Sequence, residues 1–326
     1  MGERSSINNL RPHALVSALM AQLSEQVIGQ DAVVRGLVLA LLCEGHVLVE
    51  GPPGTGKTRA VKSLARSLNA SFGRIQFTPD LLPSDLTGNE VYTESRELIF
   101  QPGPVFNAIV LADEINRAPA RVQSALLEAM EERQVTIGGQ TYPLPAPFLV
   151  MATQNSQDQE GTYPLPEAQL DRFLMKLDID YPDRESDLAI LDLQHKEERG
   201  LSPFDLTLTL DQVAEAQSEI SKINVSRAIA EYIVDLVQAT RHPERYGEDL
   251  QRWIRRGSSA RATLALHRTA RASAWLEGRD YVTPDDVRSV LVPCLSHRIH
   301  LSYDAVVASV SASEVIDALA QNVTAL

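Results

Sequence analysis

The chain has 326 residues, 44% of them hydrophobic and 22% charged, which suits one large or two ordinary globular domains and excludes a disordered chain. A formal net charge of −13 disfavours non-specific binding of nucleic acid by the outer surface. With only Cys43 and Cys294, both in apolar surroundings, and with no predicted signal peptide or membrane span, the sequence indicates a cytoplasmic protein with buried, reduced thiols.

The first predicted elements lead into a glycine-rich loop. Helical patterns cover residues 13–24 and 31–43, the second with Asp31 as a possible cap, and residues 46–50 predict a short buried strand. Residues 51–58 read GPPGTGKT and match the phosphate-loop pattern in full, and a helical pattern follows at 59–68. Strand, glycine loop and helix is the context in which backbone N–H groups surround phosphate oxygens, so we expect a nucleotide site here rather than a simple turn.

Individual residues of this loop have predicted roles. We expect Lys57 to reach the β- and γ-phosphates and Thr58 to hold Mg²⁺. Gly54 and Gly56 leave room for phosphate where a side chain would obstruct it. The expected nucleotide-binding set comprises Pro53, Gly54, Thr55, Gly56, Lys57, Thr58 and Arg59.

The remainder of the first half predicts a sheet with crossover helices. A helical pattern covers residues 120–133, and polar turns indicate hairpins near 90–100 and 134–142. Further strands are predicted from short apolar runs at 73–77, 109–112, 148–152 and 174–179. Strands that alternate with helices predict an α/β fold with a parallel sheet.

The pattern changes near residue 183. Beyond it the spacing is mostly helical, and Thr283, followed by Pro284 and two acids, predicts the start of a capped helix. We therefore expect an α/β nucleotide-binding core at 1–183 and a smaller helical domain at 184–326.

Two carboxylates follow the predicted central strand. Asp113 and Glu114 come directly after the apolar run 109–112, which places them at the carboxyl end of a parallel strand, where ligands bind in open α/β sheets. We expect Asp113 to hold Mg²⁺ with Thr58, and Glu114 to orient and deprotonate the attacking water. A solvated strand end is the alternative, which the upstream phosphate loop disfavours.

Three further residues are candidates for the chemistry of hydrolysis. Asn155, after the strand at 148–152, can position water against the γ-phosphate or simply occupy a turn. Arg172 can contact the γ-phosphate of a neighbouring subunit, worth about 10³–10⁵ in rate, or form a surface ion pair with Asp171. Arg261, in the helical domain, can contact the phosphates from a lid or remain a solvated helix residue.

Longer segments of the chain resemble one family. They read RIQFTPDLLPSDLTG at 74–88, ADEINRAP at 112–119, QSALLEAM at 123–130, ATQN at 152–155 and QEGTYPLPEAQLDRF at 159–173. These strings are similar to the MoxR family of AAA+ ATPases, and the similarity extends from about residue 26 to 300. The resemblance implies a AAA+ P-loop core, with a central parallel sheet flanked by helices, and a C-terminal all-helical lid.

The resemblance also implies residue roles. The hairpin near 90–100 would be the helix-2 insert and the one near 134–143 the pre-sensor-1 hairpin, both directed toward the pore of a ring that we expect to be a hexamer. Arg117 would approach a neighbour's nucleotide. The other implied roles are an adenine pocket at Val27 and Ile28, sensor 1 at Asn155, the arginine finger at Arg172 and sensor 2 at Arg261.

At the level of function, the resemblance implies ATP and Mg²⁺ as cofactors. It implies chaperone-like remodelling or maturation of protein complexes, including cofactor or metal insertion, with a protein client and a separate partner that carries a von Willebrand factor type A domain. One alternative is a nucleotide-gated assembly module with incidental hydrolysis, which the intact Glu114, Asn155, Arg172 and Arg261 disfavour. The other is a nucleic-acid remodelling ATPase, which the acidic balance disfavours.

Overall fold

The computed structural model of the chain describes residues 11–92, 96–155, 161–201 and 206–325. The chain forms two compact units, Met1–Arg172 with Leu177–Val213, and Phe173–Lys176 with Ala214–Leu326. The boundary predicted at residue 183 falls inside the first unit. Helix α8 (Arg184–Glu198) belongs to that unit, and an ion pair between Arg59 and Glu197 joins it to helix α4 (Lys57–Ser67).

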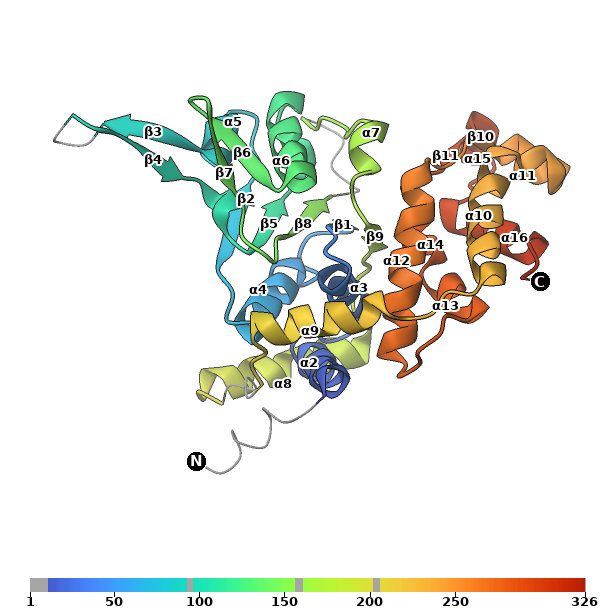
Figure 1. The fold of residues 1–326 in the computed structure, drawn as a ribbon, viewed down its shortest axis with the longest axis horizontal. Coiled ribbons are helices and arrows are strands. Elements are labelled where there is room, and N and C mark those ends of the chain that lie inside the picture. Colours follow the sequence, from blue (N-terminus) through green and yellow to red (C-terminus); the bar gives the residue numbers. More distant parts are fainter. Residues whose placement is uncertain (1–10, 93–95, 156–160, 202–205, 326) are drawn as a thin grey trace. The chain divides into compact units, whose positions relative to one another are not determined.

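A five-stranded sheet forms the centre of the first unit, in the order β2-β5-β8-β1-β9 (Figure 1). The pairs β2–β5, β5–β8 and β8–β1 are parallel, as predicted. The central strand β5 is buried on both faces, with Ile109, Val110, Leu111 and Ala112 fully inaccessible to solvent. The strands are β1 (Val47–Glu50), β2 (Phe72–Gln76), β5 (Ile109–Asp113), β8 (Leu149–Gln154) and β9 (Met175–Asp178).

Helices pack around this sheet. Helix α2 (Pro12–Gln26) contacts α3 (Asp31–Leu42) and α4, α3 packs on β1, and α4 packs on β5. Asp31 is the first residue of α3 and not its cap, because Gln30 holds the cap position; the carboxylate still lies at the positive end of the helix dipole. The remaining elements of this unit are α5 (Pro83–Thr87), α6 (Ala120–Glu132), α7 (Glu167–Leu170), the start of α9 (Leu210–Ser221) and 3₁₀ turns at Pro104–Phe106 and Ile115–Arg117.

Both predicted hairpins are present. Strands β3 (Gly88–Tyr92) and β4 (Leu98–Pro102) form an arm that projects from the sheet (Figure 1), and β6 (Gln134–Ile137) pairs with β7 (Gln140–Pro143). Gly138 and Gly139 form the β6–β7 turn with positive φ angles of 57° and 81°, the conformation that a two-residue hairpin requires. The Phe100 ring stacks on that of Tyr142 with centroids 4.1 Å apart, which ties the two hairpins together.

The second unit is mostly helical in its described residues, and it contains a short antiparallel pair, β10 (Ile254–Arg256) with β11 (His300–Leu301). The predicted helix start at Thr283 is confirmed, because its hydroxyl accepts from the Asp286 N–H while Asp286 accepts from the Thr283 N–H. No described helix of the chain combines the length and the apolarity needed to cross a bilayer. The helices are α10 (Arg227–Arg241), α11 (Glu248–Trp253), α12 (Ala260–Leu276), α13 (Pro284–Ser289), α14 (Leu291–Leu295), α15 (Tyr303–Val307) and α16 (Ala312–Asn322), with a 3₁₀ turn at Pro243–Arg245.

Candidate functional site

The glycine loop between β1 and α4 has the geometry of a phosphate cradle. Gly54 and Gly56 have positive φ angles of 83° and 82°, which disfavour any residue with a side chain. A Cβ built on either glycine would meet no atom within 4 Å, so both face open space. The loop thus leaves room for an anion beside the N-terminus of α4, where the helix dipole is positive.

This space is a cavity of about 360 Å³, and it collects most of the predicted site residues. The phosphate loop forms one part of its wall, and the carboxyl ends of β5 and β8 contribute the rest. The lining residues are Pro53, Gly54, Thr55, Gly56, Lys57, Thr58, Arg59, Asp113, Glu114, Thr153, Gln154 and Asn155.

Lys57 is held at the base of the cavity. Its ammonium donates to the Gly51 carbonyl oxygen and lies 3.4 Å from that of Gln154. Burial lowers the pKa of Lys57 below its ordinary value, and the negative charges of Asp113, Glu114 and Glu50 oppose this shift. The lysine is therefore partly desolvated and faces acidic groups, a setting in which added phosphate charge would stabilise its protonated form.

The two carboxylates are fixed through Thr153 on the neighbouring strand. The Thr153 hydroxyl donates to Asp113 Oδ1 at 2.7 Å, and it accepts from the Glu114 backbone N–H at 2.9 Å. Glu114 has a left-handed backbone with φ of 58°, which is uncommon for a residue with a side chain and is found at functional sites. This turn ends β5, and the side chains of Asp113 and Glu114 contact different neighbours.

Charged and polar side chains contact both acids, and two of them, Arg74 and Gln76, were not predicted as site residues. Arg74, on β2, donates to Asp113 Oδ2 at 2.7 Å, and Gln76, on the same strand, donates to Glu114 Oε2 at 3.0 Å. Arg117 makes an ion pair with the same Glu114 oxygen at 3.1 Å. The register of β2 against β5 pairs Gln76 with Asp113. The alternation along β2 places Arg74 and Gln76 on one face of the strand, but only the strand order of the folded sheet puts that face beside the two acids.

The loop after Glu114 is secured by a buried amide. Gln123, on α6, is fully buried, and its Nε2 lies 3.0–3.3 Å from the carbonyl oxygens of Ile115, Ala118 and Tyr163. These contacts join the segment after β5 to the segment that leads into α7. Sequence reasoning assigned Gln123 no role, because its acceptors are backbone atoms that leave no sequence signature.

Other predicted residues lie outside the cavity lining. Val27, which is buried, and Ile28 occupy the turn between α2 and α3. Arg172 follows α7, and its Nε lies 2.6 Å from Glu131 Oε2 at an angle that makes the contact an ion pair and not a good hydrogen bond. Its partner is thus on α6. Arg261 belongs to the second unit, in the first turn of α12 after the Ser259 cap.

The donor set of the cavity suits Mg²⁺. Thr58 and Asp113 line the same cavity, one with a hydroxyl and the other with a carboxylate, and hard oxygen ligands are those that Mg²⁺ prefers beside phosphates. The described residues hold no cluster of three or more His, Cys, Asp or Glu, so a site built from protein ligands alone has no candidate among them. Cys43 and Cys294 are both buried thiols outside any disulfide, as predicted.

Comparisons with known proteins place this geometry among ATPases. Residues 46–175 match the model of an ATPase family associated with various cellular activities (AAA), and residues 252–319 match that of a AAA lid domain. The crystal structure of a protein from Cytophaga hutchinsonii superimposes with a TM-score of 0.90 at 42% identity, covering 97% of this chain and 96% of that one.

Curated relatives are similar over nearly the whole chain. Chaperone MoxR1 of Mycobacterium tuberculosis is 45% identical over 315 residues, which cover 95% of this chain and 82% of that protein. Protein MoxR of Paracoccus denitrificans is 36% identical over 89% of this chain and 90% of its own length. A chloroplastic magnesium-chelatase subunit of Arabidopsis thaliana, ChlI-1, is 24% identical over 84% of this chain and 73% of its own.

Proposed function

The chain belongs to the MoxR family of AAA+ ATPases, and on this premise we propose that it is a chaperone-like machine that uses ATP hydrolysis to remodel or mature protein complexes, cofactor or metal insertion included. The observation that carries the proposal is the single cavity in which Lys57, Asp113, Glu114 and Asn155 converge beside an open glycine cradle. A module that only binds nucleotide has no need of Glu114 and Asn155.

Within one protomer the proposed roles follow from the contacts. Lys57 binds the β- and γ-phosphates, and Thr58 and Asp113 hold Mg²⁺, which when bound neutralises charge on the phosphate oxygens. Glu114 orients the attacking water and takes its proton, and Asn155 fixes that water from the end of β8. Val27 and Ile28 would contact the adenine.

The remaining roles require a neighbouring copy of the chain or movement of the lid. We assign Arg172 as the arginine finger and Arg261 as sensor 2, with Arg117 near a neighbour's nucleotide, in a ring that we expect to be hexameric. The exposure of the Arg172 side chain supports this role, because it is 31% exposed and its guanidinium can pair with a phosphate group bound by a neighbouring copy.

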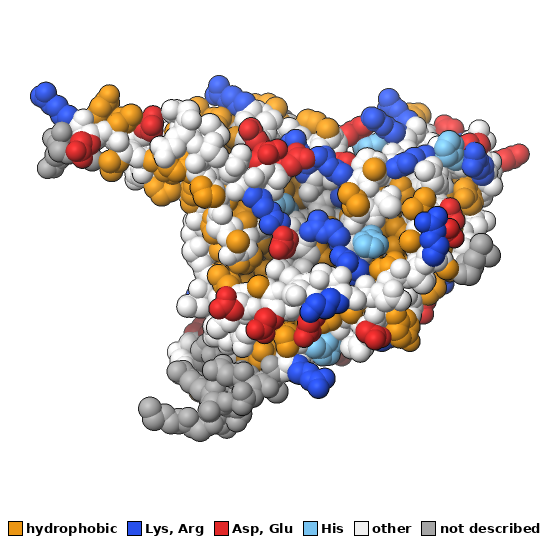
Figure 2. Space-filling model, in the orientation of Figure 1, with side chains coloured by type: hydrophobic (Ala, Val, Ile, Leu, Met, Phe, Trp, Pro, Cys, Tyr) orange, Lys and Arg blue, Asp and Glu red, His pale blue; other side chains and the backbone are white. Residues whose placement is uncertain are grey.

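The β3–β4 hairpin supplies the contact surface for a protein client. Hydrophobic side chains gather along the β3–β4 arm (Figure 2), where Tyr92, Leu98 and Ile99 are 77%, 51% and 47% exposed. Exposed apolar groups of this kind favour contact with protein over nucleic acid. We expect a separate partner with a von Willebrand factor type A domain to join the client in the cytoplasm.

Two measurements test the proposal. Specific ATPase activity should rise with protein concentration, because each site needs Arg172 of a neighbour; a constant value down to monomer would contradict the shared site. In the native host, Glu114→Gln should retain ATP and capture the client. If client maturation continues at the normal rate without hydrolysis, the protein is instead a nucleotide-gated assembly module.

A further inference from the structure

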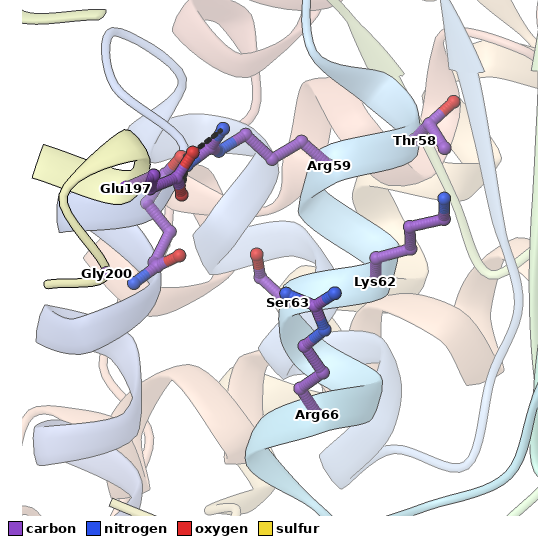
Figure 3. Close-up of a pocket in the computed structure, with 8 residues that line it drawn as sticks. Thr58, Arg59, Lys62, Ser63, Arg66, Glu197 and Gly200 are labelled. Carbon is purple, nitrogen blue, oxygen red and sulfur yellow. Dashed lines mark hydrogen bonds and ion pairs between the residues drawn. The ribbon is translucent and has the colours of Figure 1, made fainter. Parts of the chain in front are cut away.

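The guanidinium of Arg59 contacts two other helices of the first unit, although Arg59 also lines the phosphate-loop cavity. Its Nε donates to the backbone carbonyl oxygen of Gln26, the last residue of α2, at 2.7 Å. Its terminal nitrogens contact the two carboxylate oxygens of Glu197, in the last turn of α8, one of them at 3.3 Å. Figure 3 shows this side chain extending from α4 to Glu197. One side chain therefore joins α4 to both α2 and α8.

The Gln26 carbonyl is a group that needs a donor. The last four carbonyl groups of a helix have no partner within the helix, and they form the negative end of its dipole. Gln26 is 1% exposed, so water has little access to it and a protein donor takes the place of water. A positively charged donor makes a stronger hydrogen bond than a neutral one. Arg59 thus caps α2 from a different helix.

The position of this contact in the chain connects it to the nucleotide site. Gln26 directly precedes Val27 and Ile28, which we propose to contact the adenine. Arg59 directly follows Thr58, which lines the phosphate-loop cavity. The bond from Arg59 to Gln26 therefore sets the distance between the turn proposed for the base and the helix end proposed for the phosphates.

Glu197 fixes the direction of the Arg59 side chain. Arginine is long and flexible, and a carboxylate that faces both of its terminal nitrogens imposes one geometry on the guanidinium. The two side chains are each 39% exposed, so their ion pair adds little to the stability of the fold. Its loss should therefore release the Gln26 carbonyl from its position without unfolding the protein.

Helix α8 also supports the same turn from its other end. Gly29, in the turn at 27–30, packs so closely against Ser186, in the first turn of α8, that a Cβ at Gly29 would lie 2.7 Å from Ser186 Oγ. Ser186 and Glu197 are about 16 Å apart along the helix axis, at about 1.5 Å per residue. The start of α8 thus holds the turn by direct packing, and its end holds the turn through Arg59.

We propose that Glu197 is a positioning residue for the nucleotide, which acts through Arg59 to hold the base-binding turn at a fixed distance from the phosphate loop. The inference rests on the proposed function, because it takes this site to bind an adenine nucleotide. A ligand that contacts both the turn and the loop gains affinity when their separation is preorganised. A ligand made only of phosphates contacts the loop alone, so its affinity does not depend on that separation.

Displacement of fluorescently labelled ADP measures the affinities of ADP and of inorganic pyrophosphate at one site of the full-length protein. Glu197→Gln should weaken ADP about five- to tenfold, the effect of about one hydrogen bond, while pyrophosphate changes by less than about twofold. Arg59→Lys keeps the charge without the fork and should act in the same way. The double variant should be no weaker than either single variant, because both act through one contact. Glu198→Gln is the matched control, since Glu198 accepts from Gln194 instead, and it should bind both ligands as the parent does.

The ratio of the two affinities decides the outcome. A ratio unchanged from the parent in Glu197→Gln overturns the inference, because a general loosening of α4, or the lost charge alone, acts on both ligands alike. Additive losses in the double variant also overturn it, because Glu197 would then not act through Arg59. In either case, binding of ADP by the parent leaves the proposed function standing. If the parent binds no labelled ADP, the proposed function fails and this inference fails with it. Melting temperatures check that each variant is folded.

Discussion

The ion pair between Glu131 and Arg172 leads to a sharp prediction about catalysis in trans. If Arg172 is the arginine finger, then Glu131 helps to set the direction of its guanidinium, because the carboxylate lies 2.6 Å from Nε. Glu131→Gln keeps the size of the side chain and removes the charge. Glu132→Gln, the next residue of the same helix, is the matched control.

The expected magnitudes separate a positioning role from a structural one. The pair is about one-third exposed on each side, so its loss should cost at most about 1 kcal/mol of folding stability, or a few degrees in melting temperature. An arginine finger contributes about 10³–10⁵ in rate, and misplacement of a catalytic group by about 1 Å costs about 10². We therefore expect kcat to fall about 10- to 100-fold while KM stays within about twofold.

A mixing assay identifies the route of the effect. Glu114→Gln protomers are inactive themselves but carry an intact finger, so in mixed assemblies they should restore hydrolysis at neighbouring Glu131→Gln sites. An equal mixture should recover about one quarter of parent activity, because half of the sites can hydrolyse and half of those adjoin an intact finger. Failure of the mixture to recover, while Arg172→Ala with Glu114→Gln does recover, would refute the role of Glu131 and leave the finger assignment standing. Failure of both mixtures would refute the finger assignment itself.

Three further predictions concern stability. Asp286→Asn should lower the free energy of unfolding, measured by urea denaturation, by about 3 kcal/mol, because the Asp286 side chain is 3% exposed and pairs in bidentate fashion with Arg279. A change below about 1 kcal/mol would contradict this contribution of the pair. Burial, with help from the positive charge of Arg298, holds the pKa of His297 well below its ordinary value of 6.5. Below pH 6.5 the unfolded chain therefore binds a proton at this residue that the folded chain does not, and the free energy of unfolding should fall by up to about 1.4 kcal/mol per pH unit. His297→Gln should reduce that slope. Gln123→Leu should cost about 2 kcal/mol through its lost carbonyl contacts, and Gln123→Glu should not restore them, because a carboxylate has no N–H to donate.

Much of the first unit could be predicted because its signals are local. The apolar run 109–112 predicts a buried strand from its own composition, and β5 is that strand. Gly138-Gly139 predicts a tight turn because only glycine adopts two left-handed conformations in succession without strain. Asp113 and Glu114 could be placed by the general rule for the carboxyl ends of parallel strands, and both line the cavity.

What the sequence could not predict depends on pairing between distant segments. Arg74 and Gln76 reach the two acids only because β2 lies next to β5, and that order comes from the folded sheet. Local spacing offered Asp171 as the partner of Arg172, whereas the structure pairs Arg172 with Glu131, 41 positions earlier on a different helix. The assignment of α8 to the first unit likewise depends on packing between distant segments, because the change to helical patterning near residue 183 does not reveal which unit that helix packs against.

These side-chain contacts identify α6 as the element that positions both halves of the proposed shared site. Gln123, near its start, fixes the loop that follows Glu114, and Glu131, near its end, holds Arg172. The two residues are about 12 Å apart along the helix axis, so one rigid helix joins the loop after Glu114, the proposed base of one site, to Arg172, the side chain proposed to act at the neighbouring site. A shift of α6 would therefore move Gln123 and Glu131 together, and with them the loop after Glu114 and the Arg172 side chain.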